Sequence, residues 1–395
     1  MSNMPGLTIL MISLITFDAI SPALKYFLNS SSFNMITSAF CLEYILHKIN
    51  IMLVIKIYRI IDLHEDVAYF FQSASSEHVK DFDKDLPDRH ADIPKYKKAG
   101  IKMIFSAVFP AIRTWDPFKE KMMQNLYGRE GSAIVSSFAG RDNLLEQIKI
   151  YYRLERFFKD HIKIVSDRAD IENLDREEKI MFLISLEGAD LLNDPEDLEL
   201  LFRLGIRSLA VTWNYDNKFG SSCTSRRDYG LTAYGEALVE EANRLGVIID
   251  ISHSSRKTSL DVLEISREPV IASHSNYYGR KAHPRNIDDQ ILEGIKKTKG
   301  VIGFTFITST IGGEGSIDDL VAHIIDVKER FGSDILAIGS DFFGIEKTPR
   351  GLEDVTKIPD LLRKLSEKGF SDNEIRGISY ENVLRVLREY SKKWI

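Results

Sequence analysis

At residues 60–66 the chain has the sequence IIDLHED, a short apolar run that ends in His64 and Asp66. Three other apolar runs end in a comparable way: FLISLEG (182–188) with Glu187, VIIDISH (247–253) with His253, and PVIASH (269–274) with His274. Imidazole and carboxylate groups at the carboxyl ends of successive strands are typical of an enzyme built on a parallel barrel. The pattern predicts a metal site at one rim of such a barrel.

Eight β-rich runs alternate with helical segments along most of the chain, at 60–66, 101–109, 180–186, 206–212, 247–252, 270–273, 301–306 and 335–339. Apolar spacing and glycine stops predict helices between them at 143–165, 198–204, 232–245, 260–266, 288–297 and 317–331. This alternation predicts parallel strands with crossover helices, and eight strands predict closure into a (β/α)₈ TIM barrel. Two C-terminal helices, at 355–367 and 373–390, are expected to pack on the barrel wall.

The composition is that of a globular protein with a large core, since 44% of the residues are hydrophobic and 28% are charged. The length of 395 residues fits one barrel of about 250 residues with extensions. A net charge of −6, without a cluster of Lys and Arg, argues against nucleic-acid binding. Two cysteines, Cys41 and Cys223, make no disulfide framework and no C-x-x-C pair, which indicates a reducing cytoplasm.

Residues 1–51 differ from the rest because they are apolar, rich in Ser and Asn, and almost without charge. We interpret them as a poorly ordered or misassigned N-terminal extension before a single barrel domain at 52–395. Secretion and membrane anchoring are the alternatives. However, the run 7–17 is too short to span a bilayer, and Glu43, His47 and Lys48 interrupt the run 35–55. We expect a cytoplasmic protein, with membrane association through the extension as the alternative.

Five side chains form the expected metal site. His64 and Asp66 are two residues apart on an extended chain and therefore point to the same side. His253 and His274 each follow a strand, and the two strands are neighbours in a barrel; Glu187 ends its own strand. The five ligands suffice for two zinc ions bridged by a carboxylate, with positions left for water and substrate. The alternative is a set of unrelated core and surface residues.

Two further residues belong to the same rim. Asp341, in AIGSDF after the eighth strand, can bind metal or move a proton, although an N-cap or turn aspartate is the alternative. Arg285, in HPRN after the sixth strand, has a planar fork suited to a substrate carboxylate, although a solvated surface arginine is the alternative.

Nine segments, in order, carry a family resemblance: DLHED (62–66), LEG (186–188), RLGIRSLAVTWN (203–214), GLTAYG (230–235), RLGVIIDISH (244–253), PVIASHS (269–275), PRN (284–286), IGSDF (338–342) and ENVLRV (381–386). With these segments the chain resembles the membrane (renal) dipeptidases, peptidase family M19, within the amidohydrolase-like metal-dependent hydrolases. The resemblance implies a (β/α)₈ fold, two zinc ions and a dipeptide substrate. It also suggests a homodimer.

The resemblance also implies roles for individual residues. His64 and Asp66 would hold one zinc ion, His253 and His274 the other, and Glu187 would bridge them. Asp341 looks like the family's acid/base, and Arg285 like its binder of the dipeptide's terminal carboxylate.

The chain departs from the kidney enzyme in the segment TWN, where that enzyme has a histidine close to the substrate and this chain has Trp213. An indole N–H can donate a hydrogen bond but cannot carry a proton, so substrate preference is affected more than metal binding. We count Trp213 and Asn214, with Arg285, as expected substrate contacts. The kidney enzyme's disulfides and lipid-anchored C-terminus have no counterpart here, which fits an intracellular relative.

The expected function is that of a zinc-dependent dipeptidase that acts through a metal-bridging hydroxide. One alternative is another metal-dependent amidohydrolase, acting on a lactone, a cyclic amide or an acylated amino acid. A second is a zinc-binding protein without catalysis, in which Trp213 blocks the substrate position.

Overall fold

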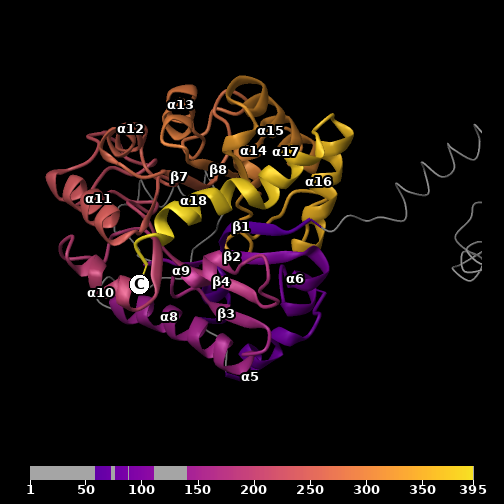
Figure 1. Cartoon of the computed structure of the whole chain (residues 1–395). Helices are drawn as coiled ribbons and strands as arrows, with labels where there is room; N and C mark the ends of the chain where they lie inside the picture. Colours follow the sequence, from indigo (N-terminus) through magenta and orange to yellow (C-terminus); the bar gives the residue numbers. More distant parts are fainter. Residues whose placement is uncertain (1–57, 73–75, 88, 111–139, 395) are drawn as a thin grey trace, which may run out of the picture. The chain divides into compact units, whose positions relative to one another are not determined.

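The computed structural model describes residues 58–394, apart from 73–75, 88 and 111–139. The predictions for residues 1–51, including Cys41, lie outside the described residues. Figure 1 shows the described part of the chain as a ring of central strands with helices around it.

Eight parallel strands close the barrel. They are β1 (Ile60–Glu65), β2 (Ile101–Val108), β4 (Ile180–Glu187), β5 (Ile206–Ala210), β6 (Ile248–Asp250), β7 (Ile271–Ser275), β8 (Val301–Phe304) and β9 (Leu336–Ile338). They pair in the order β2-β1-β9-β8-β7-β6-β5-β4, and β4 pairs back onto β2 to complete the ring. The predicted (β/α)₈ barrel is confirmed, and each predicted strand is present.

The described helices are α4 (Val67–Gln72), α5 (Ser76–Lys80), α6 (Ile93–Ala99), α8 (Gly140–Phe157), α9 (Arg168–Glu172), α10 (Asp197–Arg203), α11 (Ala233–Leu245), α12 (Arg256–Ile265), α13 (Asp289–Lys297), α14 (Thr308–Ile311), α15 (Ile317–Phe331), α16 (Ile358–Glu367), α17 (Asp372–Arg376) and α18 (Asn382–Ser391). Several begin at a side-chain cap: Thr232, Ser255 and Asp288 each accept a hydrogen bond from a backbone N–H three residues later. Gly246 ends α11 with φ 77°, as its place in the sequence predicts.

One predicted helix is wrong in its last third. A helix was expected over 143–165, but α8 ends at Phe157 and residues Ile162–Ile164 form a ninth strand, β3. β5 pairs with β4 only from Ile184 onward, which leaves the first residues of β4 without a partner on that side. β3 pairs there, at Ile180–Phe182, and buries Ile162 and Ile164. The edge of β4 that β5 leaves unpaired therefore determines that residues 162–164 form a strand, although the local sequence pattern is helical.

The C-terminal helix α18 covers the amino end of the barrel, whereas the sequence predicted packing on the wall. Met103 and Met181 alternate with residues that face the helices, so they point into the ring, and they share a buried cluster with Leu387 of α18. Tyr390 donates a hydrogen bond to the carbonyl of Pro269 (2.8 Å), just before β7. The apolar face of α18 thus closes one end of the barrel, and the carboxyl ends of the strands form the other.

Candidate metal centre

The five predicted metal ligands meet at the carboxyl end of the barrel. His64 lies in β1 and Asp66 follows it; Glu187 is the last residue of β4; His253 lies three residues beyond β6; His274 belongs to β7. All five are buried, with at most 5% of each exposed. Residues far apart in the sequence are therefore gathered where the fold predicts a site.

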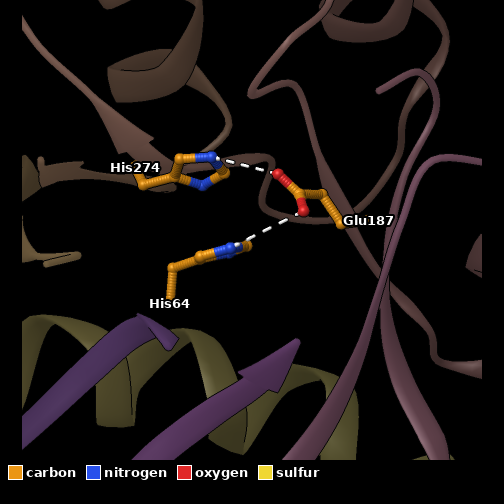
Figure 2. Close-up of side chains that lie close together, drawn as sticks. All are labelled: His64, Glu187 and His274. Carbon is orange, nitrogen blue, oxygen red and sulfur yellow. Dashed lines mark ion pairs between the residues drawn. The ribbon is translucent and has the colours of Figure 1, made fainter. Parts of the chain in front are cut away.

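Glu187 lies between the histidines. Its Oε1 is 2.7 Å from Nε2 of His253 and 3.3 Å from Nε2 of His274, and its Oε2 is 3.8 Å from Nε2 of His64. Figure 2 shows the carboxylate with one oxygen toward His274 and the other toward His64. Nε2 of His253 is 3.0 Å from Nε2 of His274. This is the arrangement expected of a carboxylate that bridges two cations.

His64 is also close to two other carboxylates. Its Nε2 is 3.6 Å from Oδ2 of Asp66 and 3.9 Å from Oδ1 of Asp341, which lies three residues beyond β9 and is 8% exposed. Ligand atoms of His64, Asp66 and Asp341 lie within 4.8 Å of one another, as do those of His64, Glu187 and His274. The structure thus brings Asp341 to the cluster from the end of β9, which pairs with β1 on the edge that β2 does not occupy.

The cluster suits a metal ion because some of its buried donor atoms are unsatisfied. Both ring nitrogens of His64 and Oδ1 of Asp66 have no hydrogen-bond partner in the described part of the chain. Buried polar atoms are nearly always paired, and an ion is one of the few explanations for exceptions. Three imidazoles with two carboxylates form a ligand set that Zn²⁺ accepts. The residues therefore fit the metal that the sequence predicts.

The charges of the cluster favour a cation near His64. Burial lowers the pKa of His64, but the carboxylates of Glu187 and Asp66, followed by Asp341, outweigh burial and raise this pKa to about 10. The metal-free site therefore holds a proton on His64, at the place where a metal ion would bring positive charge.

The other two histidines are uncharged at neutral pH. Burial, followed by the positive charges of Arg285 and His64, lowers the pKa of His253 well below its usual range. Burial, followed by the charge of His64, does the same for His274. A neutral imidazole is the form that binds a metal ion.

Two site residues have a backbone conformation that side chains seldom adopt. His253 and Asp341 each have φ 66°, in the left-handed region. Such conformations cluster at functional sites because the surrounding structure must hold them. The turns at the ends of β6 and β9 therefore aim both side chains at the cluster at some cost in backbone energy.

Arg285 is buried beside His274. It is 2% exposed, and one of its terminal nitrogens donates to the backbone carbonyl of His274 (3.1 Å). Its Nε has no hydrogen-bond partner in the described residues. Arg285 and His253 line a pocket of about 400 Å³ with Cys223, Ser254 and Asp228. The guanidinium is thus a fixed cation with a free donor next to the cluster.

Trp213 and Asn214 have different surroundings. The Trp213 ring lies 5.4 Å from the ring of Phe109 and 5.6 Å from that of Tyr215, so it belongs to an aromatic group at the rim. Oδ1 of Asn214 lies 2.8 Å from Nδ1 of His253. Asn214 was expected to contact substrate, and the structure gives it a contact to a candidate metal ligand.

Sequence reasoning missed the residues behind the cluster. Oδ1 of Asp62 accepts hydrogen bonds from the backbone N–H groups of His64 (3.2 Å) and Ser340 (2.8 Å), and so joins the ends of β1 and β9. Asp250 joins the ends of β6 and β7 in the same way, through Ser252 and Ser273. A signal was available, because each aspartate stands two or three residues before a candidate histidine in a strand.

A family model for membrane dipeptidases, peptidase family M19, matches residues 50–393. The chain belongs to the membrane dipeptidase family. The predicted metallo-dipeptidase is confirmed at the level of this family.

Several relatives show how far this membrane dipeptidase family member resembles known proteins. The dipeptidase verJ of Clonostachys rogersoniana is 30% identical over 333 residues, which are 83% of this chain and 83% of that protein. The dipeptidase tcpJ of Claviceps purpurea is 34% identical over 257 residues, 64% of this chain and 60% of that protein.

Two solved structures support the fold. A metallopeptidase from Rhodobacter sphaeroides, liganded with a phosphinate mimic of the dipeptide L-Ala-D-Ala, aligns with a TM-score of 0.75 and 23% identity over 86% of this chain and 100% of that chain. The probable dipeptidase PvdM from Pseudomonas aeruginosa aligns with a TM-score of 0.72 and 21% identity over 86% of this chain and 97% of that chain. Among the described helices, none has both the length and the apolar character needed to cross a bilayer.

Proposed function

We propose that this chain is a zinc-dependent dipeptidase that hydrolyses the peptide bond of dipeptides. One observation carries the proposal: His64, Asp66, Glu187, His253 and His274 form a single buried cluster with the carboxylate of Glu187 between the histidines. Membership of the dipeptidase family agrees with it.

The cluster would hold two Zn²⁺ ions, one with His64 and Asp66, the other with His253 and His274, and Glu187 between them. When bound, the ions would supply Lewis acidity toward the scissile carbonyl and lower the pKa of a bridging water to about 7, so that hydroxide is available near neutral pH. The chain's own contribution is a rigid set of neutral imidazoles and carboxylates in a site that excludes bulk water.

Asp341 is the proposed proton carrier. Its carboxylate lies 3.9 Å from Nε2 of His64, and Asp341 is the most exposed of the site's acidic residues, at 8%. From this position it takes a proton from the attacking water and returns it to the nitrogen of the leaving amino acid. No covalent intermediate is required.

Arg285 is the proposed anchor of the substrate's free carboxylate. Its buried guanidinium is fixed by the carbonyl of His274, and within the described part of the chain its Nε–H is unpaired beside the pocket. A carboxylate bound there gains a charge-assisted hydrogen bond, which is stronger than a neutral one. Because only a terminal residue offers this carboxylate so close to the cluster, substrates would be limited to dipeptides. Trp213 would contact the other end of the substrate.

The test is hydrolysis of a panel of L-L and L-D dipeptides by the purified protein, with zinc measured in parallel and a chelator as control. Chelator-sensitive cleavage with about two zinc ions per chain would support the proposal. A panel of lactones, cyclic amides and acylated amino acids tests the second candidate function, that of another metal-dependent amidohydrolase. Bound zinc without turnover of any substrate would point to a non-catalytic protein.

We further propose that residues 52–395 form the whole catalytic domain, in the cytoplasm and as a homodimer. A variant that begins at Met52 should keep the activity of the full chain. Light scattering during size-exclusion chromatography measures the mass of the assembly, and a monomer would contradict the dimer.

A further inference from the structure

A chain of buried side chains leads from His274 to Asp250, behind the candidate metal site. Nδ1 of His274 lies 2.8 Å from Oγ of Ser273, and the Ser273 hydroxyl donates to Oδ2 of Asp250 in a very short hydrogen bond. All three residues are buried, with at most 2% of each exposed.

The direction of each hydrogen bond in this chain is fixed by the donors around Asp250. Oδ1 of Asp250 accepts from the backbone N–H groups of Ser252 (2.8 Å) and Ser273 (2.9 Å). Oδ2 accepts the hydrogen bond that the Ser273 hydroxyl donates. A hydroxyl has one proton and two lone pairs, so Ser273 can only accept from its other neighbours.

Those neighbours are both able to donate. Ser252 lies 3.3 Å away through its Oγ, which itself accepts from the backbone N–H of His274 (3.1 Å) and so has its own proton to give. The remaining lone pair of Ser273 faces Nδ1 of His274, which must therefore carry the ring proton. A neutral imidazole has one N–H, so the lone pair lies on Nε2, the atom 3.3 Å from Glu187.

We propose that Asp250 is a positioning residue that acts through Ser273 to hold His274 in the Nδ1–H tautomer, with its Nε2 lone pair turned toward the metal site. The inference rests on the proposed zinc site and deepens it. Partners of this kind orient ligating histidines, and their loss typically weakens metal binding by about 10–100-fold.

The substitution Asp250→Asn is expected to reverse the direction of the hydrogen bonds between residue 250 and His274. The amide oxygen must remain at the Oδ1 position, because two backbone N–H groups point at it. The amide NH₂ then takes the place of Oδ2 and donates to Ser273. The Ser273 hydroxyl turns to its nearest acceptor, Nδ1 of His274 at 2.8 Å, since Oγ of Ser252 is farther away at 3.3 Å. The ring proton moves to Nε2, where it blocks the metal.

The experiment compares the full-length wild type with Asp250→Asn, Ser273→Ala, the double variant and a control, Ser208→Ala. Ser208 is a fully buried strand hydroxyl on β5 that has no hydrogen-bond partner among the residues the structure describes. Histidine ¹⁵N spectra of the zinc-free proteins identify the tautomer of His274, and competition with a chromogenic chelator measures zinc affinity.

We expect Nδ1–H in the wild type and Nε2–H in Asp250→Asn, with zinc affinity lower by about 100-fold in this variant, the upper end of the usual range. Ser273→Ala removes the hydroxyl that accepts from His274 in the wild type and that would donate to His274 in Asp250→Asn. Zinc affinity should therefore fall about tenfold in Ser273→Ala, and by the same factor in the double variant. The double variant would then bind zinc more tightly than Asp250→Asn alone. The control should keep the wild-type affinity.

An unchanged tautomer in Asp250→Asn would overturn the proposal, and so would losses that multiply in the double variant. If Asp250→Asn does not fold, the comparison of Ser273→Ala with Ser208→Ala decides, and equal zinc affinities overturn the proposal. A wild type that binds no zinc would contradict the proposed function instead, while the tautomer in the zinc-free protein still judges the role of Asp250.

Discussion

Replacing Gly344 with alanine should disable the site without changing any proposed ligand. A Cβ at this position would lie 2.1 Å from Oδ2 of Asp66 and 2.3 Å from Oδ1 of Asp341, whereas such contacts are essentially never under 3.0 Å. To reach that distance the two oxygens must move by roughly 0.9 Å and 0.7 Å, and a displacement of about 1 Å can cost on the order of 100-fold in rate. We expect zinc affinity to fall because the proposed ligand Asp66 is displaced. We expect turnover to fall by about 100-fold because the proposed proton carrier Asp341 is displaced.

The assay is steady-state dipeptide hydrolysis with zinc titrated against a competing chelator. The matched control is Gly294→Ala on α13, where the new Cβ would meet the flexible side chain of Leu263, with its nearest methyl at 2.6 Å, and where alanine favours the helix by about 1 kcal/mol. The control should keep zinc and turnover, and both metal-free variants should melt cooperatively. Wild-type zinc affinity and turnover in Gly344→Ala would refute the reasoning.

Four further outcomes are expected. Asp341→Asn should bind zinc normally while turnover falls by about 10²–10⁴-fold, because it cannot take a proton; normal turnover with metal present would contradict its role. Arg285→Lys should raise KM for dipeptides by about tenfold through loss of the planar fork, yet leave slow cleavage of C-terminally amidated dipeptides unchanged; an equal loss on both would exclude carboxylate binding. Since the pKa of His64 is raised to about 10, the metal-free ring is protonated at pH 8 and zinc must displace that proton, so affinity should rise with pH up to about 10. Calorimetry in two buffers would count the protons released, and a count of zero would contradict this. Trp213→His should change the ranking of dipeptide substrates with zinc affinity unchanged, whereas a loss of zinc would show that the indole supports the metal site.

The strands of the barrel could be predicted because each is a short apolar run with a clear end, and because their order along the chain is their order around the ring. β3 could not, since its pairing depends on an edge of β4 that only the closed barrel leaves open. The short helix α6 had local signals, a cap at Asp92 and a stop at Gly100, but at seven residues it has too few turns for a periodic pattern.

The site likewise has features that the sequence predicts and features that it does not. Residue type and place at a strand end were enough to single out His64, Glu187 and His274, because the fold alone brings strand ends together. The contact between Asn214 and His253 depends on the path of a loop, and that path has no periodic signal. The left-handed backbone at Asp341 is equally hidden, since it occurs at a residue other than glycine. Sequence thus predicts which groups gather, and the loops decide how they are turned.

The balance of charge explains why these groups stay together in one pocket. Asp66, Glu187 and Asp341 are three carboxylates in a buried space, and Arg285 supplies one fixed positive charge. The negative charges of these carboxylates stabilise the positive charge of a protonated imidazole, so the metal-free protein places a proton on His64. Cations at the cluster would replace that proton and leave Arg285 available for the substrate's carboxylate. The same three carboxylates therefore disfavour the empty site and favour the metal-bound one, so metal binding and the stability of the barrel rim are coupled.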